Sequence, residues 1–440
     1  MLWNNGDGTD TVDGGAGNDT TEVNGSQTLG DVFTLAPDQN PGQVKFQRTN
    51  LVAFTIHSTA ENFRVNGLGG NDTVTAGNGL ATLLSVDGGA GADTITGSDG
   101  PDLITGGEDN DVLNGGGGDD RIVGDRGSDT INGGAGDDTL VWNNGDGTDV
   151  MNGDAGRDDI EVNGSPTAGD VFTVKPNGSR IRFDRTNLVP FTLDIGSSET
   201  LHANGLGGDD SITDGDVGAF SVTANGGPGN DTLTGGGSSE TLLGGSGNDK
   251  ITGGGGIDVV SGDDGDDQVN VRDRTADIAL GGAGNDTAIA DTPNLDILDG
   301  FESVDRSEAG VPPVTPGHGN GHGTRAVTIG GGAVKVSRKS HTAAIRVSCP
   351  AGSAGHCTGS VTVSTAGSVH LAGLRARLQL GSARYDLAPG TSKRVKVKLA
   401  RGVERLADRK GHVKVRVVAT TGTSGNAAST SRRLTFSVQR

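Results

Sequence analysis

A nine-residue repeat dominates the first 306 residues of this 440-residue chain. Its clearest copy, Gly88–Thr96, reads GGAGADTIT, with glycines at the start, an acidic residue at position six and an aliphatic residue at position eight. Eight units within residues 88–161 and five within 226–270 keep an acid at position six and an aliphatic residue or Met at position eight. A short fixed period is typical of solenoids, in which each unit packs only on its neighbours. The repeat therefore predicts an all-β solenoid.

The composition excludes several other architectures. The chain has 80 Gly but only 10 Phe, 2 Trp and 1 Tyr, which is too few aromatic residues for the core of a compact enzyme of this length. Collagen is excluded because the glycines do not recur at every third position. The sequence also lacks the common motifs of zinc proteases, serine hydrolases and phosphate-binding loops. We therefore expect no enzymatic activity.

The charge is divided unequally along the chain. Residues 325–440 carry 21 Lys and Arg but 3 Asp and Glu, so the remaining 14 basic and 53 acidic side chains all lie in residues 1–324. Such an acidic body repels nucleic acids, anionic membranes and itself. It needs cations in order to become compact.

The free energy of one repeat unit leads to the same conclusion. A unit buries one aliphatic side chain, worth roughly 2–3 kcal/mol, while ordering nine backbone residues costs on the order of 9 kcal/mol or more. A ligand must therefore stabilise the folded state. Aspartate and exposed turn carbonyls are the oxygen ligands of Ca²⁺. Zn²⁺ would need Cys or His, and residues 1–306 contain no Cys and only His57 and His202.

The repeat GGxGxDxUx resembles that of the hemolysin-type calcium-binding (RTX) family. The resemblance implies that six residues of each unit form a calcium-binding turn and three form a strand, and that two units make one coil of a parallel β-roll. Each Ca²⁺ would lie between the turns of units n and n+2, so that Asp93 pairs with the turn of Asp111. The chain would hold about seven or more Ca²⁺ ions. The implied metal ligands are Asp19, Asp72, Asp93, Asp102, Asp111, Asp120, Asp129, Asp138, Asp149, Asp158, Asp210, Asp231, Glu240, Asp249, Asp258, Asp267 and Asp286.

Two segments between the repeats are copies of each other. Residues 23–66 and 162–204 share the pattern GDVFT…RTNLV and hold seven of the ten Phe. Their short alternating runs predict strands. They are not repeat units, and we expect them to interrupt the row of metal-binding turns. The degenerate stretch Val271–Leu280 is also expected to bind no metal.

The C-terminal part differs from the rest. After a linker rich in Pro, Gly and His, alternating Val and basic residues predict about seven strands and a small Ig-like β-sandwich. In Lys393–Lys398 the valines would face the core and the basic side chains would be exposed. Cys349 and Cys357 either form one local disulfide or remain two free thiols.

These observations predict a chain of seven segments. They are repeats at 1–22, an insert at 23–66, a β-roll block at 67–161, a second insert at 162–204, a β-roll block and cap at 205–306, a linker at 307–324 and a basic β-sandwich at 325–440.

We expect an extracellular calcium-binding protein that folds on Ca²⁺ and serves as a structural, adhesive or binding module. No signal peptide and no membrane span are visible. The basic domain could bind an acidic cell-wall polymer or polysaccharide. The alternative is that the chain is the repeat region of a larger secreted hydrolase or toxin, because the sequence begins in the middle of a repeat.

Overall fold

The computed structural model describes residues 2–4, 7–80, 82–218, 220–291 and 295–306, followed by ten strands and a few adjoining residues between positions 328 and 438. Every described element is a β-strand, which confirms the predicted all-β fold. The expected linker, residues 307–324, lies outside the described residues. The chain divides into two units, Met1–Ser238 and Ser239–Arg440, which are described separately. None of the described residues forms a helix long and apolar enough to cross a membrane.

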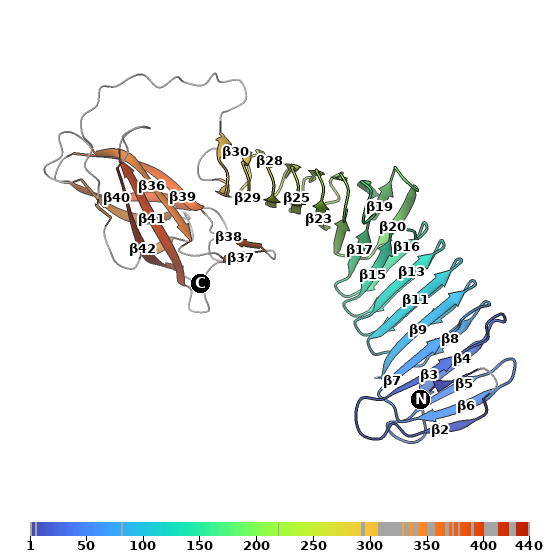
Figure 1. Cartoon of the computed structure of the whole chain (residues 1–440). Helices are drawn as coiled ribbons and strands as arrows, with labels where there is room; N and C mark the ends of the chain where they lie inside the picture. The colour runs from blue at the N-terminus through green and yellow to red at the C-terminus, as the bar shows by residue number, and fades with distance from the viewer. Residues whose placement is uncertain are drawn as a thin grey trace. The chain divides into compact units, whose positions relative to one another are not determined.

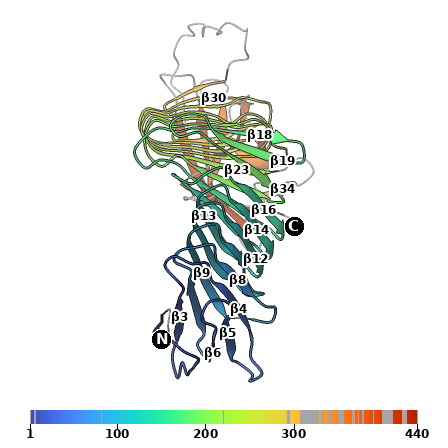
Figure 2. The same ribbon diagram turned by 90° about the vertical axis from the view of Figure 1, so that its right-hand side faces the viewer.

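The first unit is a parallel β-solenoid whose coils follow one another along the chain (Figure 1). Each coil places one strand in each of two sheets, and Figure 2 shows the two rows of strands. The first sheet runs β1 (Leu2–Trp3), β3 (Thr20–Asn24), β7 (Asn62–Asn66), β9 (Leu83–Ala90), β11 (Asp102–Glu108), β13 (Arg121–Arg126), β15 (Thr139–Asn143), β17 (Asp159–Asn163), β21 (Thr200–Asn204) and β23 (Ser221–Pro228).

The second sheet of this unit contains the shorter strands of the coils and the strands of the two inserts. Its members are β2 (Asp10–Val12), β4 (Val32–Pro37), β5 (Val44–Arg48), β6 (Phe54–Ser58), β8 (Thr73–Ala76), β10 (Thr94–Thr96), β12 (Val112–Gly117), β14 (Thr130–Ala135), β16 (Val150–Ala155), β18 (Val171–Asn177), β19 (Arg180–Arg185), β20 (Phe191–Gly196), β22 (Ser211–Asp214) and β24 (Thr232–Thr234).

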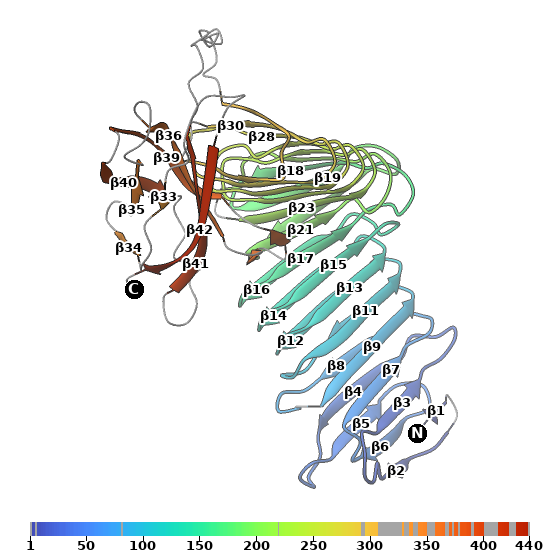
Figure 3. The ribbon, with the colours of Figure 1, turned by 60° about the vertical axis from the view of Figure 1, so that its left-hand side comes forward.

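The strand register shows that two nine-residue units make one coil, as the resemblance implied. On β11 and β13 Ile104 lies opposite Ile122, and on β12 and β14 Leu113 lies opposite Ile131. These position-eight side chains are at most 1% exposed and form a continuous core along the solenoid. Figure 3 shows the parallel stacking of these strands. Because the core is one residue wide per strand, each coil depends on its neighbours for burial.

Each insert enters the second sheet as a three-stranded antiparallel meander. In the first, β4, β5 and β6 pair in sequence, and the outer strands pair in parallel with β8 and β2. The second insert repeats this with β18, β19 and β20, which pair in parallel with β22 and β16. Aromatic side chains fill these wider coils. The ring centroids lie 3.6 Å apart in the stacked pair Trp3–Phe54 and 3.7 Å apart in Trp142–Phe191.

The second unit contains further coils of the same kind and a separate C-terminal sheet. The coil strands are β25 (Thr241–Ser246), β27 (Val259–Asp264), β29 (Ile278–Ala283) and β31 (Ile297–Asp299) in one sheet, and β26 (Lys250–Thr252), β28 (Gln268–Val271), β30 (Thr287–Ala290) and β32 (Ser303–Asp305) in the other.

The C-terminal sheet is mainly antiparallel, which is compatible with the predicted small β-domain. Its order is β33 (Thr328–Ile329), β35 (Thr342–Ser348), β34 (Val334–Ser337), β42 (Ala428–Val438), β41 (His412–Thr421), β36 (Cys357–Thr365), β39 (Gln379–Leu387) and β40 (Ser392–Leu399). Strand β40 also pairs with β35, and β37 (Val369–Leu371) forms a hairpin with β38 (Leu374–Ala376).

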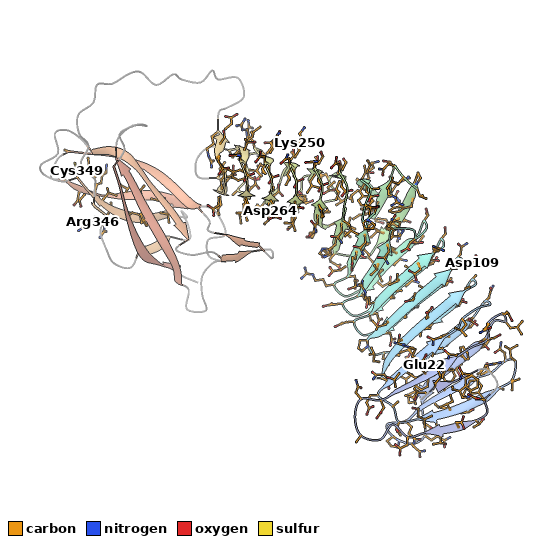
Figure 4. The ribbon with its side chains drawn as sticks, in the orientation of Figure 1. Glu22, Asp109, Lys250, Asp264, Arg346 and Cys349 are labelled. Carbon is orange, nitrogen blue, oxygen red and sulfur yellow. The ribbon has the colours of Figure 1, made fainter. Side chains whose placement is uncertain are left out.

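The described side chains of this sheet alternate as predicted. Val395 and Val397 are buried, whereas Lys393, Arg394 and Lys396 are exposed. Cys349 is 3% exposed and disulfide-bonded, so the structure selects the disulfide over the free thiol for this residue (Figure 4).

Candidate metal sites in the turns

The position-six acids lie inside the coils. Alternate residues of a strand point to the same face, so the acid shares the inner face with the aliphatic residue two positions later. Asp93 is 1% exposed and Ile95 is 0% exposed. Of the expected metal ligands, Asp19 alone is half-buried, and all the others are buried. The repeat therefore places a row of carboxyl groups in the interior of the turns.

One oxygen of most of these carboxyl groups joins neighbouring coils. The backbone N–H of Asp93 donates to Oδ1 of Asp111 at 2.8 Å, and that of Asp102 donates to Oδ1 of Asp120 at 2.8 Å. These are the n and n+2 partners that the resemblance paired. The same bond joins Asp72 to Asp93, Asp111 to Asp129, Asp120 to Asp138, Asp129 to Asp149, Asp138 to Asp158, Asp210 to Asp231, Glu240 to Asp258, Asp249 to Asp267 and Asp267 to Asp286.

The second oxygen of most of these groups has no hydrogen-bond partner within the described part of the chain. A buried anionic oxygen without a donor or cation is strongly destabilising. This oxygen is Oδ2 in Asp19, Asp72, Asp93, Asp111, Asp120, Asp129, Asp138, Asp158, Asp210, Asp258, Asp267 and Asp286. These twelve oxygens are the feature of the structure that most directly calls for a cation.

The first glycine of each turn keeps space next to this oxygen. A Cβ atom at Gly88 would collide both with Oδ2 of Asp93 and with the carbonyl oxygen of Gly106 in the next coil. A carboxylate oxygen and a carbonyl oxygen therefore lie against the same glycine. This donor set consists only of oxygen atoms, and it fits Ca²⁺ better than a metal that prefers nitrogen or sulfur.

Burial raises the pKa of Asp111, Asp120 and Asp258, and neighbouring carboxylates raise it further. The pKa of Asp111 is raised to about 7, and the pKa values of Asp120 and Asp258 are raised to about 8. The backbone N–H donors act in the opposite direction but do not overcome burial. A divalent cation beside the orphaned oxygens would favour the charged form and remove this penalty.

Side chains alone do not make a complete metal centre. Within the described residues, no three His, Cys, Asp or Glu side chains come together in a way that could hold a metal ion. A cation in these turns must therefore also take backbone carbonyl oxygens as ligands. Glycine-rich turns supply such carbonyls, because glycine reaches conformations with positive φ, such as 102° at Gly89 and 124° at Gly91.

Asp102 departs from this arrangement. Its turn has Ser98 where most units have the second glycine. The backbone N–H of Ser98 donates to Oδ2 of Asp102 at 2.6 Å, and its hydroxyl donates to Oδ1 at 3.2 Å. The protein itself therefore satisfies both oxygens, so this turn makes the weakest case for a cation among the expected ligands.

Asp277 has the same geometry but was not among the ligands expected from the sequence. Asp277 lies in the stretch expected to bind no metal, yet its Oδ1 accepts from the backbone N–H of Asp258 at 2.9 Å and its Oδ2 has no partner. Burial raises the pKa of Asp277 to about 8. Asp277 stands two residues before the buried Ala279, and this acid-x-small spacing was the available signal.

The inserts do not break the row of acids. Asp31 and Asp170 donate from their backbone N–H groups to Oδ1 of Asp72 and Asp210, at 2.5 Å and 2.6 Å. An arginine stands beside each of these two carboxylates. Nε of Arg48 lies 3.0 Å from Oδ1 of Asp31, and Nη1 of Arg185 lies 3.2 Å from Oδ1 of Asp170. All four side chains are at most 2% exposed. The guanidinium supplies within the insert the positive charge that the other turns lack.

The fold and these turns define a class of protein, a β-solenoid whose acidic glycine-rich turns are suited to hold cations. Comparison with known families gives the same result: the matching family is described as the RTX calcium-binding nonapeptide repeat (4 copies). The solenoid accordingly contains several RTX-type calcium-binding nonapeptide repeats. No curated protein matches it. The matched segments are 6–20, 64–80, 87–122, 114–141, 223–251, 243–271 and 273–291.

Proposed function

We propose that this chain is an extracellular module whose solenoid folds when Ca²⁺ enters its turns. The row of buried carboxylate oxygens without hydrogen-bond partners carries the proposal. The acids named in the sequence analysis would hold about seven or more ions, together with turn carbonyls. Bound Ca²⁺ supplies the positive charge that lets these carboxylates remain ionised inside the coils.

The protein's own residues contribute the rest of the mechanism. Oδ1 of most of the acids fixes the spacing between coils through the backbone N–H one coil earlier, and the position-eight side chains form the core. A ligand that binds only the folded state stabilises that state in proportion to the logarithm of its concentration. The chain would be mobile at the sub-micromolar Ca²⁺ of a cytosol and ordered at millimolar Ca²⁺ outside the cell. The disulfide at Cys349 supports an oxidising environment.

A calcium titration followed by far-UV circular dichroism tests the proposal. The chelator-treated chain should gain β-structure cooperatively as Ca²⁺ rises to the millimolar range, and EGTA should reverse the change. Mg²⁺ at equal concentration is the control, because it retains its waters and demands a stricter octahedral geometry. A spectrum that does not respond to Ca²⁺ or to EGTA contradicts the proposal.

A second role, adhesion, is favoured by one exposed face of the C-terminal sheet. Arg346 of β35, which is labelled in Figure 4, lies directly opposite Arg394 of β40. Lys396 is exposed two residues further along β40, on the same face as Arg394. Like charges placed opposite each other destabilise a sheet. An acidic cell-wall polymer or polysaccharide would offset that repulsion.

Immobilised poly(glycerol phosphate) is a suitable probe for this face. The full chain in Ca²⁺ should bind it with an affinity that falls with salt. The variant R346Q/R394Q/K396Q should bind at least tenfold more weakly. Equal binding by the variant and the original chain would exclude this face as the anchor.

A further inference from the structure

The turn between β22 and β23 lacks the usual acid. In regular units the acid stands two residues before the buried aliphatic residue. Before Val222 of β23 this place is occupied by Phe220. The turn between β22 and β23 thus departs from the nonapeptide pattern, and the matched repeat segments do not include residues 214–220.

Asp214 brings a carboxyl group into this turn from a different position. It stands two residues after the buried Ile212, where regular turns have their first glycine. In regular turns a side chain at that glycine would collide with the position-six carboxylate, as at Gly88. Because this turn has no position-six acid, the space is free for the side chain of Asp214.

The environment of Asp214 resembles that of the regular metal-binding acids. Asp214 is 6% exposed, and neither of its carboxylate oxygens has a hydrogen bond of good geometry to any described group. Burial raises its pKa to about 6, although the nearby backbone N–H groups of Asp216 and Val217 favour the charged form. Two anionic oxygens are buried here, whereas a regular turn leaves one orphaned.

The neighbouring coil approaches this group through two glycines. A Cβ atom on Gly236 would lie 2.8 Å from Oδ2 of Asp214 and 2.9 Å from Cα of Asp216. A Cβ atom on Gly237 would lie 3.0 Å from both carboxylate oxygens of Asp216. The next residue, Ser238, has a buried hydroxyl group without a partner. Two carboxyl groups therefore lie against the backbone of two consecutive glycines.

We propose that Asp214 and Asp216, with the backbone of Gly236 and Gly237, form an additional site for a divalent cation of the Ca²⁺ class. The site rests on the proposed function, because it extends the row of cations through a coil that lacks the nonapeptide acid. It differs from the regular sites in taking its buried carboxylate from the first position of the turn.

The duplicated sequence provides an internal comparison. The coil equivalent to β22 and its turn is β8 with residues 76–80, where Ala76 and Asn78 stand in place of Asp214 and Asp216. There the backbone N–H of Gly79 donates to Oδ2 of Asp99 at 2.7 Å, and the position of Asp99 is taken by Gly237 in the second copy. The double variant D214A/D216N thus recreates a pair of residues that the fold already contains.

Native mass spectrometry of the full chain at saturating Ca²⁺ tests the site. The original chain should bind one Ca²⁺ more than D214A/D216N. The control E22Q/D159N removes two outward-facing acids on strands and should keep the original count (Figure 4 labels Glu22). An equal count in D214A/D216N and the original chain overturns the additional site. An original chain that binds no Ca²⁺ overturns the proposed function instead.

Hydrogen exchange provides the second measurement. Addition of Ca²⁺ should protect the peptide containing residues 214–220 in the original chain, and this protection should fall at least tenfold in D214N. This single variant keeps the size of the side chain, so it decides the question if the double variant does not fold. Full protection in D214N would contradict the role of Asp214.

Discussion

The replacement of one turn acid by its neutral isostere should have opposite effects with and without calcium. Asp258 is fully buried, its Oδ1 accepts from the backbone N–H of Glu240 at 3.0 Å, and its Oδ2 has no partner. Burial first, and the carboxylates of Asp277 and Glu240 second, raise its pKa from 3.8 to about 8. D258N keeps the accepting oxygen and removes the charge.

The sign of the effect follows from proton binding. The folded, metal-free chain binds a proton at Asp258 more tightly than the unfolded chain does, so its stability falls as pH rises from about 4 to about 8. At pH 7.5 this raised pKa lowers the stability of the metal-free fold by at most about 5 kcal/mol, because folding must either protonate the group or bury its charge. D258N should therefore raise the free energy of unfolding without Ca²⁺. With free Ca²⁺ at 100 times the Kd, D258N should instead lower the free energy of unfolding by about 2.7 kcal/mol, because one binding site is lost.

Urea unfolding at pH 7.5, in chelator and in saturating Ca²⁺, measures both values. The matched control is D264N, which neutralises an exposed acid of the same coil (Figure 4) and should change stability by less than about 0.5 kcal/mol in either condition. If D258N destabilises the chain equally with and without Ca²⁺, the account of the buried charge is refuted.

Three further predictions follow from the same structure. The metal-free chain should have more β-structure by circular dichroism at pH 5 than at pH 8. Burial raises the pKa of Asp129 and Asp210 to about 7, so these groups are neutral in the folded chain at pH 5 and must bury a charge at pH 8. Loss of structure on acidification would contradict this prediction. R185M should lower the free energy of unfolding in urea by about 3–5 kcal/mol, because it leaves the buried carboxylate of Asp170 without its cation. R157M, at an exposed position, should lower it by less than about 0.5 kcal/mol. I104A should lower the free energy of unfolding by about 2–5 kcal/mol, because Ile104 is 1% exposed. L103A, at a neighbouring side chain that is 46% exposed, should have little effect. Equal melting temperatures for the two variants would count against a core that is one residue wide per strand.

The periodic part of the fold was predictable from the sequence. A fixed spacing between acid and aliphatic residue places both on one face of a strand, so the buried pair Asp93 and Ile95 follows from alternation alone. The stacking of Ile104 on Ile122 follows once two units are assigned to one coil. The paired glycines likewise indicated turns with positive φ.

The non-periodic contacts were not predictable in this way. The pair Arg48–Asp31 forms only because β4 and β5 fold back on each other as antiparallel strands, and the nonapeptide pattern contains no arginine at a fixed place. Asp214 was missed for a related reason. It occupies a position reserved for glycine, and only the burial of both its oxygens shows that it replaces the missing acid.

The most direct test of the account is the thermal unfolding of one preparation with all metal removed and again with millimolar Ca²⁺. We expect the calcium-loaded chain to unfold cooperatively at a much higher temperature, and the metal-free solenoid to have little cooperative structure at neutral pH. A metal-free chain that unfolds cooperatively at the same temperature would contradict the claim that cations hold the acidic coils together.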